Sequence, residues 1–277
     1  MKFITKKIPI IKLREMHCLT EFELDKLSKS FSKIEPYFFC SLNDTIYHKK
    51  IINIQIAINE LLGKLISEHF KDNQPKSKII RNENNVYYLI TKSFFQNGNL
   101  YTGFNNAIFP KIKYTENNRL PLNTLELLEE YQINNETIQM TKKDLERLKY
   151  KLKMMIINDF LRKQSDRWYN NFLIEYNKSH CKLMPLYDFE HSFFQFDEDL
   201  CNSFQFDLTD KNTINYIRND EQFQELLNLA MELDMKKIYE KLFDKYPVRM
   251  TKEEKEQYES IIKGKQEEIK TYKLIKM

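Results

Sequence analysis

Glycine is scarce in this sequence. The chain has 277 residues and only 4 glycines, at positions 63, 98, 103 and 264. Loops that cradle phosphate with backbone N–H groups depend on closely spaced glycines, in patterns such as G-x-G-x-x-G and G-x-x-x-x-G-K-[ST]. Neither pattern occurs here. Any nucleotide site in this protein must therefore hold phosphate by other means.

Patterns that mark a metal cluster or a membrane segment are missing as well. The four cysteines form no C-x-x-C pair and the five histidines show no metal-ligand spacing, which favours free thiols in a reduced compartment. No stretch approaches the roughly 18 uncharged apolar residues of a transmembrane helix. The first residues, MKFITKKIPIIKLREM, carry lysines where a signal peptide needs apolar side chains. We expect a cytoplasmic protein without stable membrane insertion, and secretion by a leaderless route stays open.

A large excess of one charge is also absent. The 44 basic and 40 acidic residues give a net charge of +4, spread along the whole chain, so the sequence predicts no nucleic-acid partner. Apolar residue classes make up 42% of the chain, with 20 Phe and 16 Tyr. That is too much large apolar surface for a disordered protein. The length allows one large domain or two unequal lobes.

The first part of the chain, residues 1–98, reads as a small unit of mixed secondary structure. Aromatic and β-branched runs on both sides of Asn43-Asp44 predict a hairpin over 36–51. Apolar residues at spacings of three and four predict a helix over 52–70. The run NNVYYLITKSFF predicts a strand over 85–95, which ends at the turn sequence QNGN.

The second part, residues 99–277, is mainly helical by propensity. A helix is predicted from about Thr141 to Gln164, and helices dominate from about Asp220 to the end. Between them, NFLIEYN and KLMPLYDF read as two short strands around a polar turn. The overall expectation is an α+β fold.

A polar constellation surrounds this predicted hairpin, within residues 160–193. Asp166 and Asn171 lie in FLRKQSDRWYNNFLIEYN, directly after the long helix, and Asp188 lies at the far end of the hairpin. A hairpin brings its ends together, so the two carboxylates and the carboxamide are expected to meet. Oxygen ligands of this kind suit Mg²⁺ that bridges phosphate oxygens.

The run from Met154 to Phe193 resembles the catalytic segment of HipA-like kinases, which are related to phosphatidylinositol 4-kinases and more distantly to protein kinases. That family has a helix, D-R-H-x-x-N, a short hairpin and an Asp at a strand end. The resemblance implies a two-lobed protein kinase-like fold with a small mixed N-lobe, a larger mainly helical C-lobe, and ATP and Mg²⁺ between them. Asp166 would be the catalytic residue, and Asn171 and Asp188 the metal ligands. Trp168 stands where the family usually has His.

The resemblance also implies a phosphate-pairing lysine on a strand and a glutamate on the next helix. TIYHKKI offers Lys49 as the first choice and Lys50 as the alternative, because alternation lets only one of them face a cleft. Glu60 is the candidate glutamate. It lies roughly 140° from the main apolar stripe of its helix, so it would have to use the secondary face shared with Ile56 and Gly63. The glycine-rich loop of kinases has no counterpart in residues 1–35.

The resemblance implies transfer of the γ-phosphoryl group of ATP to a serine or threonine hydroxyl, on the protein itself or on a protein substrate. It further implies a toxin or effector role with an antitoxin or regulatory partner. The missing glycine loop and Trp168 favour an alternative, a pseudokinase that binds without transferring phosphate. A lipid or small-molecule kinase is a third option, because the same Asp–Asn–Asp arrangement serves the phosphatidylinositol branch.

Overall fold

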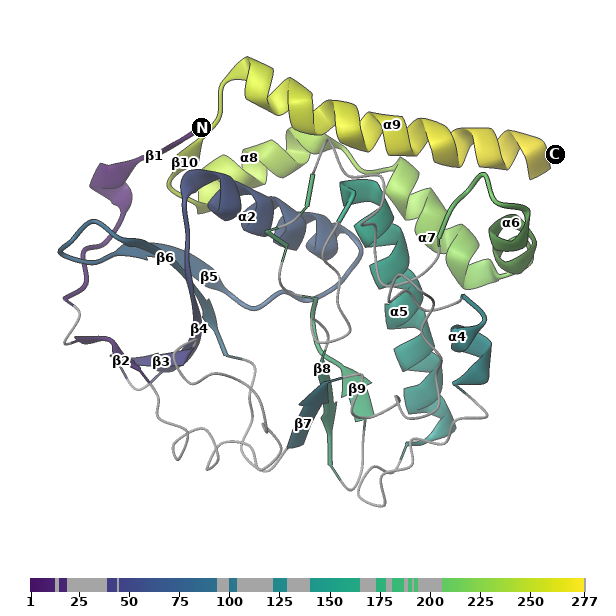
Figure 1. Ribbon diagram of the computed structural model, residues 1–277, viewed down its shortest axis with the longest axis horizontal. Helices are drawn as coiled ribbons and strands as arrows, with labels where there is room; N and C mark the ends of the chain where they lie inside the picture. The colour runs from purple at the N-terminus through teal and green to yellow at the C-terminus, as the bar shows by residue number, and fades with distance from the viewer. Residues whose placement is uncertain are drawn as a thin grey trace.

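The computed structural model shows a mixed fold of helices and small antiparallel sheets (Figure 1). Its described part contains seven α-helices and three sheets. The structure describes residues 1–12, 15–18, 39–43, 45–93, 100–103, 122–128, 140–164, 173–177, 181–186, 189–190, 192–193 and 206–276.

A five-stranded antiparallel sheet lies on one side of the molecule, with strand order β2-β3-β4-β6-β5 (Figure 1). Its strands are β2 (His17–Cys18), β3 (Phe39–Leu42), β4 (Thr45–Ile51), β5 (Ser77–Arg81) and β6 (Tyr87–Lys92). β3 and β4 form a hairpin in which Leu42 pairs with Thr45. Asn43 in the turn has a φ of 48°, a left-handed conformation that asparagine adopts more readily than most residues. The hairpin lies within 36–51, where the sequence predicts one.

Helix α2 (Ile54–His69) follows β4 directly, where the sequence predicts a helix over 52–70. Asn53 caps it, because its side chain accepts a hydrogen bond of 2.8 Å from the Ile56 N–H. The helix is buried without interruption from Ala57 to Ser67. It shares a core with residues of β5 and β6 and also packs against α8. Tertiary packing on several sides therefore accounts for the burial of its polar residues.

The remaining helices form the other side of the molecule. They are α4 (Thr124–Leu127), α5 (Lys142–Arg162), α6 (Lys211–Ile217), α7 (Glu221–Met231), α8 (Met235–Lys245) and α9 (Lys252–Lys276). A capping box between Thr141 and Asp144 starts α5, and α5 packs against α7 and α9. The long helix α9 runs across the top of this group (Figure 1). None of the helices in the described ranges is long and apolar enough to cross a membrane.

A three-stranded antiparallel sheet lies beside α5, in the order β7-β8-β9. Its strands are β7 (Leu100–Gly103), β8 (Leu173–Tyr176) and β9 (Cys181–Leu183). β8 and β9 form the hairpin that NFLIEYN and KLMPLYDF predict, and β9 packs against α5. Beyond β9, Phe189, Glu190 and Ser192 form hydrogen bonds to Glu60 and Asn59 of α2.

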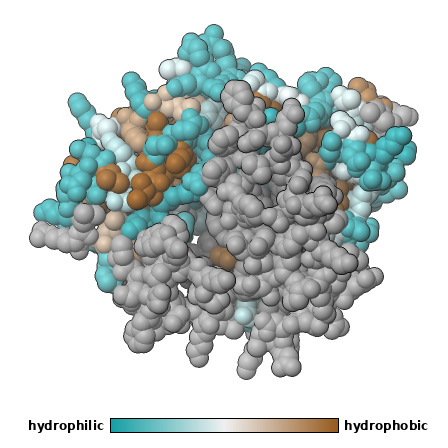
Figure 2. All heavy atoms as spheres, in the orientation of Figure 1, coloured by the Kyte–Doolittle hydropathy of each residue, from teal (hydrophilic) through white to brown (hydrophobic). Residues whose placement is uncertain are grey.

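The first twelve residues connect the helices to the five-stranded sheet. Strand β1 (Lys2–Phe3) pairs with β10 (Val248–Arg249), which lies between α8 and α9. After a short 3-10 helix, η1 (Thr5–Lys7), the Ile11 N–H donates to the Arg81 carbonyl at 2.8 Å. Figure 2 shows an apolar patch at the upper left of the face that it draws. Ile10, which follows η1, and Ile51, at the end of β4, are exposed large hydrophobic residues.

Candidate functional site

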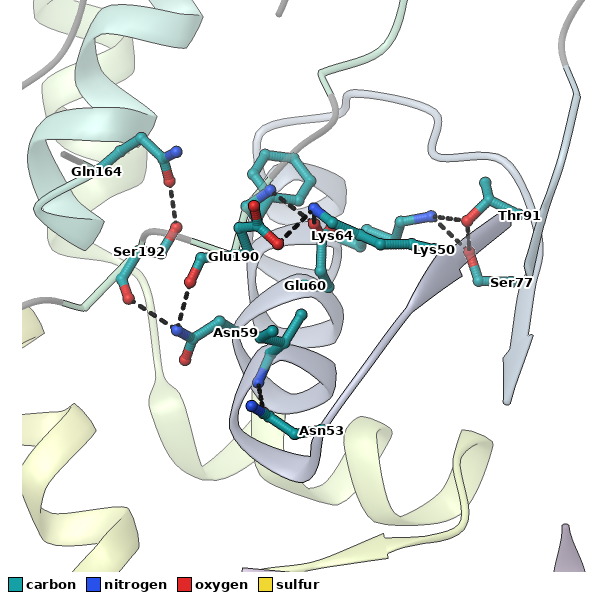
Figure 3. Close-up of polar contacts among 12 residues, drawn as sticks. Lys50, Asn53, Asn59, Glu60, Lys64, Ser77, Thr91, Gln164, Glu190 and Ser192 are labelled. Carbon is teal, nitrogen blue, oxygen red and sulfur yellow. Dashed lines mark hydrogen bonds and ion pairs between the residues drawn. The ribbon is translucent and has the colours of Figure 1, made fainter. Parts of the chain in front are cut away.

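An ion pair joins strand β4 to helix α2. Lys50 Nζ lies 2.7 Å from Glu60 Oε1 (Figure 3). The Glu60 side chain is only 5% exposed, whereas the Lys50 side chain is 20% exposed. The pair forms because α2 starts three residues after β4 ends and packs back along the sheet, which places its second turn beside the end of the strand. Lys50 thus has a fixed partner and a surface that solvent can reach.

The neighbouring Lys49 has a different environment. Its ammonium lies 5.9 Å from the centre of the Tyr88 ring, a cation–π distance. Successive side chains of a strand point to opposite faces of the sheet. The pair with Glu60 comes from Lys50, although the sequence favours Lys49 as the first choice.

The segment after Asp188 meets both members of this ion pair. The Phe189 N–H donates to Glu60 Oε1 at 3.1 Å, and Glu190 Oε2 lies 2.9 Å from Lys50 Nζ. One Glu60 oxygen therefore serves the lysine and the backbone of the segment together. Lys50 in turn lies between two carboxylates (Figure 3).

The Phe189 ring is enclosed between α2 and α5. It is fully buried, and a Cβ built on Gly63 would lie 2.4 Å from its Cγ. On another side, the Arg162 guanidinium carbon lies 4.4 Å from the ring centre. Only a residue without a side chain fits at position 63, so the scarce glycine there has a structural reason.

Arg162 ends α5 in a buried polar network. Its guanidinium bonds to Asp159 Oδ1 at 2.7 Å, Asn158 Oδ1 at 2.8 Å and Ser192 Oγ at 2.7 Å. The Arg162 carbonyl also accepts from the Phe193 N–H at 2.6 Å. Burial of a guanidinium is costly unless its donors are satisfied. This network ties the end of α5, four residues before Asp166 in the sequence, to residues 192 and 193.

Two more side chains fix the same segment. The Asn59 amide donates to the carbonyls of Glu190, at 2.7 Å, and Ser192, at 3.0 Å. Upstream, the Leu186 N–H donates to Asp72 Oδ2 at 2.9 Å, and Asp72 also pairs with Lys151. Hydrogen bonds therefore hold the chain on both sides of Asp188.

The three residues of the predicted metal cluster lie outside the described residues. These are Asp166, Asn171 and Asp188, and Trp168 lies outside them too. Among the residues that are described, no group of three His, Cys, Asp or Glu side chains is arranged to hold a metal ion. The catalytic and metal-binding roles stay predictions.

A buried lysine, Lys64, lies one turn after Glu60 on α2. Its ammonium donates to Thr91 Oγ1 at 2.9 Å and to Ser77 Oγ, and both hydroxyls belong to the five-stranded sheet (Figure 3). Burial lowers the pKa of Lys64 to about 8, even though the nearby Glu60 and Glu68 act to raise it. Lys64 thus contrasts with Lys50, which pairs with carboxylates.

The sequence did not single out several of these contacts. No local sequence pattern indicates the roles of four residues, because each depends on a partner distant in the chain. They are Asn59, Asp72, Phe189 and Glu190. Gly63 is the exception, because a glycine inside a predicted helix often indicates close approach of another group.

No protein-family model matches this sequence, and no curated protein matches it. Solved structures similar to this chain were found. The proinflammatory kinase CtkA of Helicobacter pylori is similar with a TM-score of 0.59 and 16% identity, over 90% of this chain and 97% of CtkA. HipA of Shewanella oneidensis, solved with HipB and operator DNA as a toxin–antitoxin system, is similar with a TM-score of 0.52 and 11% identity. That match covers 85% of this chain and 58% of HipA.

The chain has the fold of HipA-like kinases. The resemblance predicted from residues 154–193 is confirmed at the level of the fold, across most of the chain. At these identities the similarity concerns the fold alone, and a function follows only from the residues of this sequence. The ion pair of Lys50 with Glu60 joins the two residue types that the resemblance predicts for a HipA-like site.

Proposed function

We propose that this protein is an ATP-dependent kinase of the HipA-like type. The observation that carries the proposal is the contact set of Glu60, which binds Lys50 at 2.7 Å and the Phe189 N–H at 3.1 Å. This set links a strand lysine, a helix glutamate and the residue after Asp188. A kinase needs these parts in register to hold phosphate and metal together.

The proposed architecture has two lobes, residues 1–98 and 99–277, with ATP between them. Lys50 takes the phosphate-pairing role in place of Lys49, the first choice from the sequence. Glu60 orients Lys50. The 20% exposure of the Lys50 side chain supports access of an anion to this residue. Phosphate oxygens are acceptors that suit such an ammonium.

Three residues carry the proposed chemistry. Asp166 aligns the acceptor hydroxyl or takes its proton, while Asn171 and Asp188 supply oxygen ligands to Mg²⁺. When bound, Mg²⁺ supplies neutralisation of charge on the phosphates. Hydrogen bonds anchor the backbone of Leu186 and Phe189, on both sides of Asp188 in the sequence, which supports the proposal.

The proposed acceptor is a serine or threonine hydroxyl, on this protein or on a protein substrate. An antitoxin or regulatory partner and a cytoplasmic setting complete the proposal. The partner is suggested by HipA, which was solved with HipB.

The test is incubation of purified protein with γ-labelled ATP and Mg²⁺, beside Asp166→Ala and Asp188→Ala. We expect label on the wild-type protein or on an added substrate and none with either variant. A control variant is Asp244→Ala on α8, an acidic residue that the proposal leaves out of the site. Wild-type protein that binds nucleotide but transfers no label would contradict the proposal.

That outcome would favour the second candidate, a pseudokinase. The observation behind it is the lack of any glycine-rich phosphate loop in a chain with 4 glycines. Label that appears only on added lipid or a small molecule would instead indicate the third candidate, a kinase for such an acceptor.

A further inference from the structure

Two carboxylates share Lys50, and they differ in how firmly they are held. Glu60 is 5% exposed and also accepts from the Phe189 N–H. Glu190 is 26% exposed, and its Oε2 lies 2.9 Å from the Lys50 ammonium. Glu60 is therefore the buried partner of the lysine, and Glu190 is the more exposed one.

The backbone of Glu190 is fixed even though its side chain is partly exposed. Its carbonyl accepts from the Asn59 amide at 2.7 Å, and the preceding Phe189 is buried between Gly63 and Arg162. The Glu190 carboxylate thus contacts Lys50 from a segment whose backbone is anchored. Packing of Phe189 in the core fixes where that segment lies.

We propose that Glu190 is an internal competitor for the phosphate position on Lys50. Its carboxylate contacts the lysine ammonium, and an incoming polyphosphate must displace it. Two carboxylates contact this one ammonium, and Glu190 adds a negative charge beside it. An anion meets that charge until Glu190 swings away, so Glu190 weakens polyphosphate binding. The source of the polyphosphate, ATP, rests on the proposed function.

The position of Glu190 in the sequence agrees with this role. It lies two residues after Asp188, so the same short segment would supply a metal ligand and the competing carboxylate. Displacement of Glu190 from Lys50 would therefore accompany the arrival of phosphate beside Asp188.

The experiment is titration calorimetry with inorganic tripolyphosphate and with Mg²⁺ plus a non-hydrolysable ATP analogue. The proteins are wild type, Glu190→Gln and Glu60→Gln, with Glu190→Ala as a second removal of the same charge. The matched control is Glu68→Gln, which removes a carboxylate from α2 that pairs with Lys245 at 3.2 Å. A thermal melt of each protein checks that it is folded.

We expect the Kd for tripolyphosphate to fall roughly two- to fivefold in Glu190→Gln, the range for a partly exposed ion pair. The Kd should be unchanged in Glu68→Gln. It should be higher in Glu60→Gln, because Glu60 orients the lysine. The gain should vanish when Glu190→Gln is combined with Lys50→Met, because the competition acts through that lysine.

The possible results separate this inference from the proposed function. Tighter tripolyphosphate binding without any phosphoryl transfer would support the inference and count against the kinase. Transfer of label by the wild type, with no gain in Glu190→Gln or Glu190→Ala, would overturn the inference and leave the kinase standing. Failure of tripolyphosphate to bind any of the folded proteins would also overturn the inference.

Discussion

The ring of Phe189 occupies the space that a side chain at Gly63 would fill. A Cβ at position 63 would lie 2.4 Å from Phe189 Cγ and 2.5 Å from its Cβ. Gly63 lies on α2 one turn after Glu60, and the backbone of Phe189 is bonded to that glutamate. Glycine and phenylalanine together thus set how closely the segment after Asp188 approaches the helix.

The first prediction is that Gly63→Ala destabilises the protein. The new methyl group would collide with a buried ring, and overpacking of this kind costs about 1–3 kcal/mol. Relief of the clash would move Phe189 away from Glu60 and Arg162. Urea unfolding measures the change in the free energy of unfolding.

Gly264 provides the matched control for that variant. It lies within α9, and nothing lies within 4 Å of a Cβ built there. Gly264→Ala should therefore raise the stability, by about 0.5–1 kcal/mol, because alanine loses less entropy in a helix. Equal effects of the two substitutions would contradict the packing described for Phe189.

The second prediction concerns the buried guanidinium of Arg162. Arg162→Met removes the ion pair with Asp159, at 2.7 Å, from a site where both side chains are fully buried. Loss of one member of a buried pair costs about 3–5 kcal/mol. Thermal or urea unfolding should show this loss. Arg147→Met is the control, since Arg147 is 62% exposed and its carboxylate partner lies 3.9 Å away; it should change stability by less than about 0.5 kcal/mol.

The helix α2 shows what the sequence can reveal and where it stops. Its apolar spacing predicts a helix and one buried face, and the structure has the helix at Ile54–His69. Three polar residues of α2 are buried as well, because each bonds to a residue from a distant part of the chain. These pairs are Asn59 with Glu190, Glu60 with Phe189, and Lys64 with Thr91. Periodicity marks the face that meets a core, but it cannot mark polar residues that are buried by specific partners.

Short strands show the same limit. The sequence of β5, SKIIR, has two apolar residues in a row and carries no alternation, so it does not predict a strand. β5 exists because it pairs along β6, with Ile79 opposite Leu89. The same holds for β7, which pairs with β8. Strands of this length depend on their neighbours more than on their own residues.

The choice between Lys49 and Lys50 illustrates why the site was only partly predictable. Strand alternation indicates that one of the two faces α2, but it gives no sign for which one. That depends on how α2 packs, and the packing places Glu60 at Lys50. The lysine and glutamate types could be predicted, whereas the pairing required the fold.

The third prediction follows from this pairing. Lys50→Met should raise the Kd for a Mg²⁺–ATP analogue by about tenfold or more, the effect of losing a charged hydrogen bond. Lys49→Met should change it by less than about twofold, because that lysine lies over the Tyr88 ring. Calorimetric titration of both variants measures the difference. A larger effect for Lys49→Met would return the phosphate-pairing role to Lys49.

The fourth prediction concerns the pH dependence of stability through Lys64. Burial lowers its pKa in the folded protein from 10.5 to about 8. Between these values the unfolded chain binds the proton and the folded protein does not, so folding becomes more favourable as pH rises. From pH 8 to 9.5 the free energy of unfolding should gain up to roughly 2 kcal/mol from this group. Urea unfolding at several pH values measures it.

Lys64→Met tests the assignment, because methionine fills similar space without a charge to titrate. The variant should lose the rise between pH 8 and 9.5, and it should be more stable than the wild type below pH 8, where the wild type bears the cost of a buried ammonium. Its loss of bonds to the Ser77 and Thr91 hydroxyls offsets part of that gain. Lys263→Met, at a lysine 71% exposed on α9, should keep the pH dependence of the wild type. A rise that persists in Lys64→Met would show that another group causes it.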